Sequence, residues 1–266
     1  MNTQQLDQLK ERLTGYIQTF YTKDDEFLNS NIRLKECHTQ RVCAEMRALA
    51  ETLAMTPADR ILAETVALLH DAGRFEQFTK YRTYKDTISE NHCLLGLRVI
   101  SEKQWLDDLL PDERSLIQKA IEFHGAKELP AMNERVLHFA KMIRDVDKLD
   151  IFHLCMENYR RFHENKKAYT FEVEFPDSIE VTPEILESIL NNRVIDYRLL
   201  KTLTDAKLLQ LGWVFDTYFD WTLRQMRDRG YIDGITCWLP DTEPVQQAVR
   251  HINRYVAKRL GDANHI

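Results

Sequence analysis

Apolar side chains recur every three or four residues along most of this chain, the spacing of one face of an α-helix. The first such stripe predicts a helix over residues 4–22 and consists of Leu6, Leu9, Leu13, Ile17 and Phe20. Glycine (8) and proline (7) are scarce among the 266 residues, so the chain has few helix breakers. The sequence therefore predicts an all-α fold, in which the one strand-like run is YTFEVEFPDSIEVT at residues 169–182.

Further helices are predicted from the same spacing, with a loop over residues 80–90. One of them starts at Thr56 as N-cap with Pro57 in its first turn, runs to Ala72 and is closed by Gly73. The others cover about 38–55, 91–103, 112–124, 132–155, a segment from Pro183, 197–229 with a bend near Gly212, and 242–260. No flexible linker separates them. We expect a helical core over residues 1–165 and a mostly helical extension, 166–266, packed on that core.

Charge and cysteine content narrow the classes of function. A net charge of −6 does not favour nucleic acid as a partner, although a local basic patch or a metal can still bind a small anion. The five cysteines are odd in number and widely spaced, which indicates reduced thiols. The N-terminus lacks the apolar core of a signal peptide, and no apolar run could span a membrane. We expect a cytoplasmic protein without membrane contact, and the oligomeric state stays open.

Four histidines are placed on predicted buried faces or at their ends. His70 and the adjacent Asp71 close the apolar run ILAETVALLHDAGRF, where the simplest interpretation is a histidine that caps a helix. His38, His92 and His124, however, each lie in line with the apolar stripe of their own helix. Taken singly, each is as well explained as a hydrogen-bonded core histidine.

The segment KMIRDVDKLDIF supplies carboxylates to the same core. The apolar stripe Val136, Ala140 and Ile143 continues at Asp147, which is therefore the expected inward side chain. Asp145 is expected to be solvated, and Asp150 to be partly inward. Buried charges are costly unless they are paired or bind a metal. Imidazoles and carboxylates without cysteine suit one or two ions of Mn, Fe, Co, Ni or Zn.

The order His38, His70-Asp71, Asp147 resembles the HD superfamily of metal-dependent phosphohydrolases, whose motif is H…HD…D. The resemblance covers residues 35–155 and extends to HTQRV, ALLHDAGRF and DVDKLDIF around these positions. It implies an HD-domain helical bundle with a first metal on His38, His70, Asp71 and Asp147. NHCLLG at His92 and IEFHG at His124 resemble the family's second-metal positions, with Asp71 as the bridging ligand.

The implied activity is hydrolysis of a nucleotide or another small phosphoester through a metal-bound hydroxide, with Asp71 at its centre. Arg74 is a candidate phosphate contact or else a surface arginine paired with an acid such as Glu76. Residues 80–85 either hold a phosphate and a base or form a solvated loop. Two other functions stay open: a di-iron oxygenase of the same fold and a non-catalytic regulatory module that binds a ligand.

Overall fold

The computed structural model describes residues 1–166 and 175–262, and every regular element within these ranges is a helix. The chain divides into two compact units between Asp147 and Lys148, inside the helix α7 (Glu134–Glu164). No described helix is both long and apolar enough to cross a membrane. The predicted all-α class is confirmed. The expected division at residue 165 and the packing of the extension on the core stay predictions.

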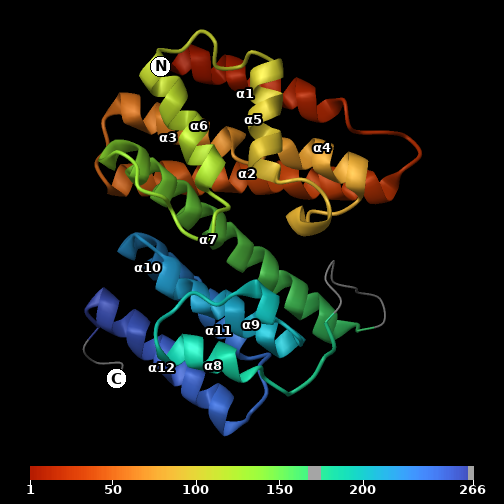
Figure 1. Ribbon diagram of the computed structural model, residues 1–266, viewed down its shortest axis with the longest axis vertical. Helices are drawn as coiled ribbons and strands as arrows, with labels where there is room; N and C mark the ends of the chain where they lie inside the picture. Colours follow the sequence, from red (N-terminus) through yellow and green to blue (C-terminus); the bar gives the residue numbers. More distant parts are fainter. Residues whose placement is uncertain (167–174, 263–266) are drawn as a thin grey trace. The chain divides into compact units, whose positions relative to one another are not determined.

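The first unit is a bundle built around a long helix, α2, with α3 and α4 beside it (Figure 1). Further contacts join α1 to α3, α3 to α6, α4 to α5 and α5 to α6. Its elements are α1 (Thr3–Gln18), α2 (Glu26–Thr52), α3 (Pro57–Leu69), α4 (Ala72–Tyr81), the 3₁₀ turn η1 (Asp86–Ile88), α5 (His92–Glu102), α6 (Pro111–Phe123) and the start of α7.

The second unit packs the rest of α7 with shorter helices around a separate apolar core that includes Phe152, Leu208 and Ile252. Within it, α8 contacts α9 and α12, and α10 contacts α11 and α12. Its further elements are α8 (Pro183–Leu190), η2 (Tyr197–Leu199), α9 (Leu203–Gly212), η3 (Trp213–Asp216), α10 (Asp220–Asp228), α11 (Tyr231–Thr236) and α12 (Glu243–Leu260).

Two helix boundaries differ from the prediction in the first unit. Thr56 does cap α3, because its hydroxyl accepts a hydrogen bond from the Asp59 amide. Gly73, however, does not close that helix: α3 ends at Leu69, and Gly73 lies inside α4. Its role is close packing, since a Cβ at this position would come within 2.5 Å of the backbone nitrogen of Gly96 on α5. The glycine therefore lets α4 and α5 approach closely.

The predicted long helix over residues 197–229 is wrong, because the chain breaks there into η2, α9, η3 and α10. A new helix starts after Thr202, whose hydroxyl accepts from the Asp205 amide. The second break lies at Thr217, which is extended. The carbonyls of Thr217 and Tyr218 accept from the Arg259 guanidinium instead of continuing a helix. Because these carbonyls keep hydrogen-bond partners, the end of the helix does not leave them unsatisfied.

Strand content was expected over residues 169–182. Residues 169–174 of that segment lie outside the described residues, and 175–182 form no strand. This second stretch is held by side chains of α9 instead. The Thr182 amide donates to the Asp205 carboxylate, and the Thr204 hydroxyl donates to the Ser178 carbonyl. These bonds satisfy the extended backbone without a partner strand.

Candidate metal centre

The adjacent pair His70 and Asp71 lies in the short junction between α3 and α4, with both side chains buried. Nδ1 of His70 is 2.8 Å from the carbonyl oxygen of Ala67. A carbonyl only accepts, so Nδ1 carries the proton and Nε2 is left with a lone pair that faces inward. The helix end thus fixes the ring in the tautomer that a metal ligand needs.

Two more rings are held in the same way. His124, at the end of α6, donates from Nδ1 to the Ile121 carbonyl at 2.7 Å. His92, the first residue of α5, has Nδ1 2.6 Å from a carboxylate oxygen of Asp86. In each case Nε2 is the nitrogen that is directed toward the other ligand candidates. An outer partner on the second ring nitrogen is the usual arrangement around a metal-binding histidine.

The Nε2 nitrogens form two close pairs. Nε2 of His70 lies 3.3 Å from Nε2 of His38 on α2. Nε2 of His92 lies 3.1 Å from Nε2 of His124. Two lone pairs that face each other at this distance repel unless a proton or a cation lies beside both of them. Each pair is therefore suited to hold a cation.

Asp71 lies between the two pairs and offers one oxygen to each. Its Oδ2 is 3.5 Å from Nε2 of His38 and 3.6 Å from Nε2 of His70. Its Oδ1 is 3.7 Å from Nε2 of His92 and 3.9 Å from Nε2 of His124. One buried carboxylate thus joins both histidine pairs into a single centre.

Asp147 adds a carboxylate to the first pair, as its predicted inward orientation requires. Its Oδ1 is 3.2 Å from Nε2 of His38 and 3.9 Å from Nε2 of His70. The expected solvation of Asp145 is wrong, because this side chain is fully buried. Helix α7 is buried on all sides at this level, where Ile143 and Val146 are also inaccessible, so it has no solvent face. Asp150 is buried as well.

The electrostatic environment favours the metal-binding protonation states of His70, Asp71 and Asp147. Burial lowers the pKa of His70 to about 4, so the ring is neutral near pH 7. Burial by itself raises the pKa of Asp71, but the charges of Lys35 and Arg74 outweigh it and hold that pKa well below its ordinary value. The pKa of Asp147 is likewise lowered, because a hydrogen bond and charge from His38 outweigh burial. For His124 burial lowers the pKa, but the neighbouring Cys93 outweighs burial and raises it.

Two cations border the centre on the side of Asp71. Nζ of Lys35, one turn before His38 on α2, is 2.8 Å from Asp71 Oδ2. Nε of Arg74 is 3.4 Å from Asp71 Oδ1, and the same guanidinium donates to Asp86. Arg74 therefore pairs with Asp71 and Asp86, and both cations also lie near the ring of Tyr84.

The segment 80–85 is partly helical and firmly held. Helix α4 extends to Tyr81, so the predicted loop begins two residues later than expected. Arg82 pairs with Asp25, and the Tyr84 hydroxyl donates to the Asn31 carbonyl at 2.8 Å. These contacts anchor the segment to α2 and to the residues before it. Of this segment, Tyr84 is the residue that the structure places beside the cations of the centre.

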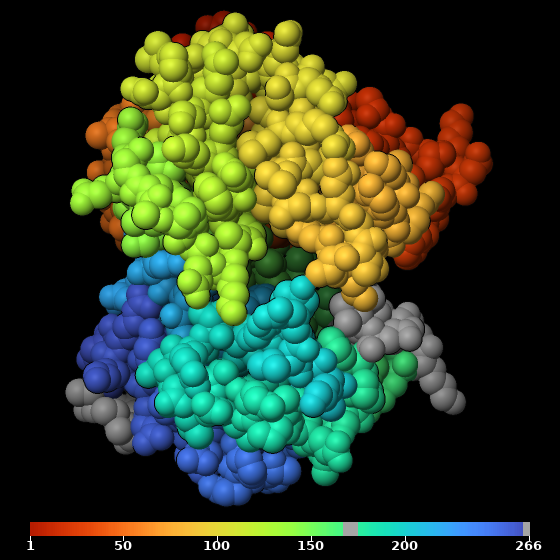
Figure 2. Space-filling view, viewed as in Figure 1, coloured from red at the N-terminus to blue at the C-terminus, as the bar shows by residue number. Residues whose placement is uncertain are grey.

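Two further groups position the ligand candidates. Arg144 on α7 is buried and donates to the carbonyls of His124 and Ala126, so it holds the turn at the end of α6. Asp86 at η1 orients His92 and also accepts from Gln77. In Figure 2 the lime segment that follows α6 and the gold segment around η1 lie at the surface of the first unit. The segment after α6 carries the Ala126 carbonyl that Arg144 binds, and the segment around η1 carries Asp86, which holds His92.

The comparisons with known proteins agree with this geometry. The family model of the HD domain matches residues 36–154. This segment is an HD domain. Among curated proteins and solved structures, none matches the chain. The HD domain covers every histidine and carboxylate of the centre, and the predicted resemblance is confirmed over those residues.

The HD domain brings together all six predicted ligand candidates: His38, His70, Asp71, His92, His124 and Asp147. Two groupings, His38–His70–Asp71 and His70–His124–Asp147, have donor atoms close enough to share an ion. Their role as ligands stays a prediction. The predicted ligand set contains no cysteine, and the structure places Sγ of Cys93 3.4 Å from His92 Nε2. Its one signal in the sequence is its position next to His92.

Lys35 and Asp86 were also missed by the sequence analysis. Lys35 precedes His38 by three residues, so it shares a helix face with that histidine, a signal that the sequence does contain. Asp86 lies in an irregular segment, and only the three-dimensional structure brings its carboxylate to His92. No residue spacing could have revealed that contact.

Proposed function

We propose that the HD domain is a metal-dependent phosphohydrolase that acts on a nucleotide or another small phosphoester. The observation that carries this proposal is the position of Asp71 between two histidine pairs, with one oxygen toward each. A carboxylate shared in this way is suited to hold two ions side by side. Bound divalent ions would lower the pKa of a coordinated water and polarise a phosphoryl oxygen.

In this proposal the chain's own residues divide the work. His38, His70 and Asp147 hold one ion, His92 and His124 hold the other, and Asp71 contacts both. The donor set of neutral imidazoles and ionised carboxylates suits Mn, Fe, Co, Ni or Zn. The rings of His70, His92 and His124 are already oriented through their Nδ1 contacts, so little reorganisation accompanies binding.

Lys35 and Arg74 are the proposed phosphate contacts. Both are positioned within ion-pair distance of Asp71, and their side chains are 15% exposed, so they can reach a bound anion. A metal ion at Asp71 would compete with them for its oxygens and leave their charges available to a phosphoryl group. Guanidinium groups bind phosphate in two-pronged hydrogen bonds, which favours Arg74 for orienting the substrate. Tyr84, beside both cations, offers a ring face for a base.

A substrate screen tests the proposal. The full chain, loaded in turn with Mn, Fe, Co, Ni or Zn, is incubated with phosphomonoesters, phosphodiesters and nucleotides, with and without dioxygen. We expect metal-dependent release of phosphate or of a nucleoside monophosphate in the absence of dioxygen. Asp71→Ala should abolish it and keep the helical circular-dichroism signal, whereas Asp107→Ala, an exposed carboxylate, should not alter it. Oxidation that requires dioxygen would favour the oxygenase. If no substrate is turned over, the ligand-binding module would be favoured.

A further inference from the structure

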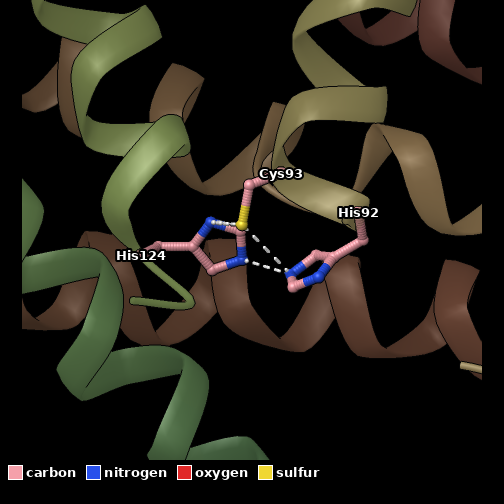
Figure 3. Close-up of side chains that lie close together, drawn as sticks. All are labelled: His92, Cys93 and His124. Carbon is pink, nitrogen blue, oxygen red and sulfur yellow. Dashed lines mark hydrogen bonds between the residues drawn. The ribbon is translucent and has the colours of Figure 1, made fainter. Parts of the chain in front are cut away.

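Cys93 lies against the second histidine pair. Its Sγ is 3.4 Å from Nε2 of His92 and 3.5 Å from Nδ1 of His124, and Figure 3 shows the sulfur directed at both rings. All three side chains are buried. One nitrogen or sulfur donor from each lies close enough to the others to share an ion. A buried thiol packed against two imidazoles is thus part of the centre's donor set.

Two of the donor distances match a tetrahedral ion. Zn–S and Zn–N bonds of about 2.3 Å and 2.0–2.1 Å place sulfur and nitrogen about 3.5 Å apart and two nitrogens about 3.3 Å apart in a tetrahedron. The structure has 3.4 Å between Sγ and Nε2 of His92, and 3.1 Å between the Nε2 atoms of His92 and His124. The described contact of the sulfur with His124 is to Nδ1, so the sulfur must also move toward Nε2 of that ring to complete the set.

The local backbone places the sulfur at the start of a helix. Helix α5 begins at His92, after the Asn91 cap, so Cys93 lies in its first turn. The positive end of a helix dipole favours negative charge there. Gly125 passes directly over the group: a Cβ at this residue would lie 3.2 Å from Sγ and 3.1 Å from Cε1 of His92. Glycine is what leaves room for the sulfur and its neighbours.

We propose that Cys93 is a further protein ligand, beside His92, His124 and Asp71, of the metal position on the Oδ1 side of Asp71. This inference rests on the proposed function because it assigns a donor to the same centre. On binding, the thiol gives up its proton to solvent and the sulfur bonds to the ion as thiolate. A donor set of thiolate and imidazole selects Zn and related borderline ions. The other position, which has the carboxylates of Asp71 and Asp147, also suits Mn. The two positions thus differ in their preferred metal.

Cobalt absorption spectroscopy on the full chain tests the ligand assignment. With Co²⁺ in excess, wild-type protein should show a thiolate-to-cobalt charge-transfer band in the near ultraviolet. Cys93→Ala should lose the band, and Cys43→Ala, another buried cysteine on α2, should keep it. In zinc-loaded wild type, X-ray absorption should show a sulfur neighbour at about 2.3 Å. The zinc affinity of Cys93→Ala should fall at least about tenfold, with manganese binding little changed.

Each outcome decides the matter. Two bound cobalt ions without a thiolate band, or a band that persists in Cys93→Ala, would overturn the assignment, and so would a chain that binds no cobalt. If Cys93→Ala does not fold, the wild-type spectrum and its zinc–sulfur distance still decide. A thiolate band without any phosphoester turnover would leave Cys93 as a ligand and remove the proposed function. Turnover with two bound ions but no thiolate band would support the proposed function and reject Cys93 as a ligand.

Discussion

Oδ1 of Asp71 lies 3.7 Å from Nε2 of His92, although Asp71 lies in the junction before α4 and His92 is the first residue of α5. The other oxygen of Asp71 is directed at His38 and His70. One carboxylate between two imidazole pairs makes the two proposed ion positions dependent on each other. Changes at Asp71 should therefore affect both.

Replacing Asp71 with asparagine keeps the shape of the side chain but removes its charge. We expect the affinity for Mn²⁺ to fall by more than about 100-fold at both positions, because even outer contacts of a metal ligand are worth about 10- to 100-fold. Isothermal titration calorimetry measures this. Asp107→Asn, at the exposed surface, is the matched control. Two tightly bound ions in Asp71→Asn would show that the carboxylate is not shared.

The double variant His92→Ala with His124→Ala should hold one ion per chain where the wild type holds up to two. The first position keeps His38, His70, Asp71 and Asp147, so the fold should persist. Turnover should be mostly lost, since the second Lewis acid is gone. Elemental analysis after loading with Mn or Fe counts the ions. Equal metal content in both proteins would mean that His92 and His124 contact the substrate or are core residues that bind no metal.

Gly73→Ala should loosen the contact between α4 and α5. Its added Cβ would come 2.5 Å from the Gly96 nitrogen, and the neighbours there are backbone atoms that cannot rotate away. Overpacking of this kind costs about 1–3 kcal/mol of unfolding free energy. Gly15→Ala on α1 is the control, because nothing lies within 4 Å of its new Cβ. That variant should gain up to about 1 kcal/mol in urea denaturation. Equal effects of the two substitutions would contradict the close approach.

Asp86 should give the metal-free protein a pH-dependent stability. Burial raises its pKa, but the hydrogen bond and charge of His92, with the charge of Arg74, outweigh this and lower the pKa to about 2. The unfolded value is about 3.9. A depressed folded pKa stabilises the fold above about pH 4, and the contribution is lost as the pH falls toward about 2.

Asp86→Asn should accordingly unfold more easily than the wild type near pH 6, by about 1–2 kcal/mol. The difference should shrink between about pH 4 and pH 2, where the wild-type carboxyl becomes protonated. Urea denaturation of both proteins at several pH values, with a chelator present, measures it. A difference that stays constant down to pH 2 would mean that Asp86 is not ionised in the folded protein.

Helical periodicity was sufficient to place His38, His92 and His124 on buried faces, because they continue apolar stripes of their helices. It also directed Asp147, which is partly exposed, toward the same centre. The same reasoning failed for Asp145. It assumed that α7 has a solvent face opposite its apolar stripe, whereas the helix is buried around its whole circumference there. A periodic pattern shows which side of a helix is apolar, but not whether the other side is covered.

The groups that surround the ligands were harder to predict, for a different reason. Asp86 reaches His92 from a short irregular turn, and Arg144 binds backbone carbonyls of the turn after α6. Neither contact follows from periodicity, because each depends on how a loop folds back on a helix. Cys93 was set aside as one of several free thiols, and only its distance to the rings assigns it to the centre.

Asp71 is proposed to separate two metal positions, and anomalous X-ray diffraction from crystals of the full chain grown with Mn²⁺ tests this arrangement. Two anomalous peaks about 3.5–4 Å apart are expected. One should be ligated by His38, His70 and Asp147, the other by His92 and His124, with one Asp71 oxygen on each. A single peak, or two peaks that do not share Asp71, would contradict it.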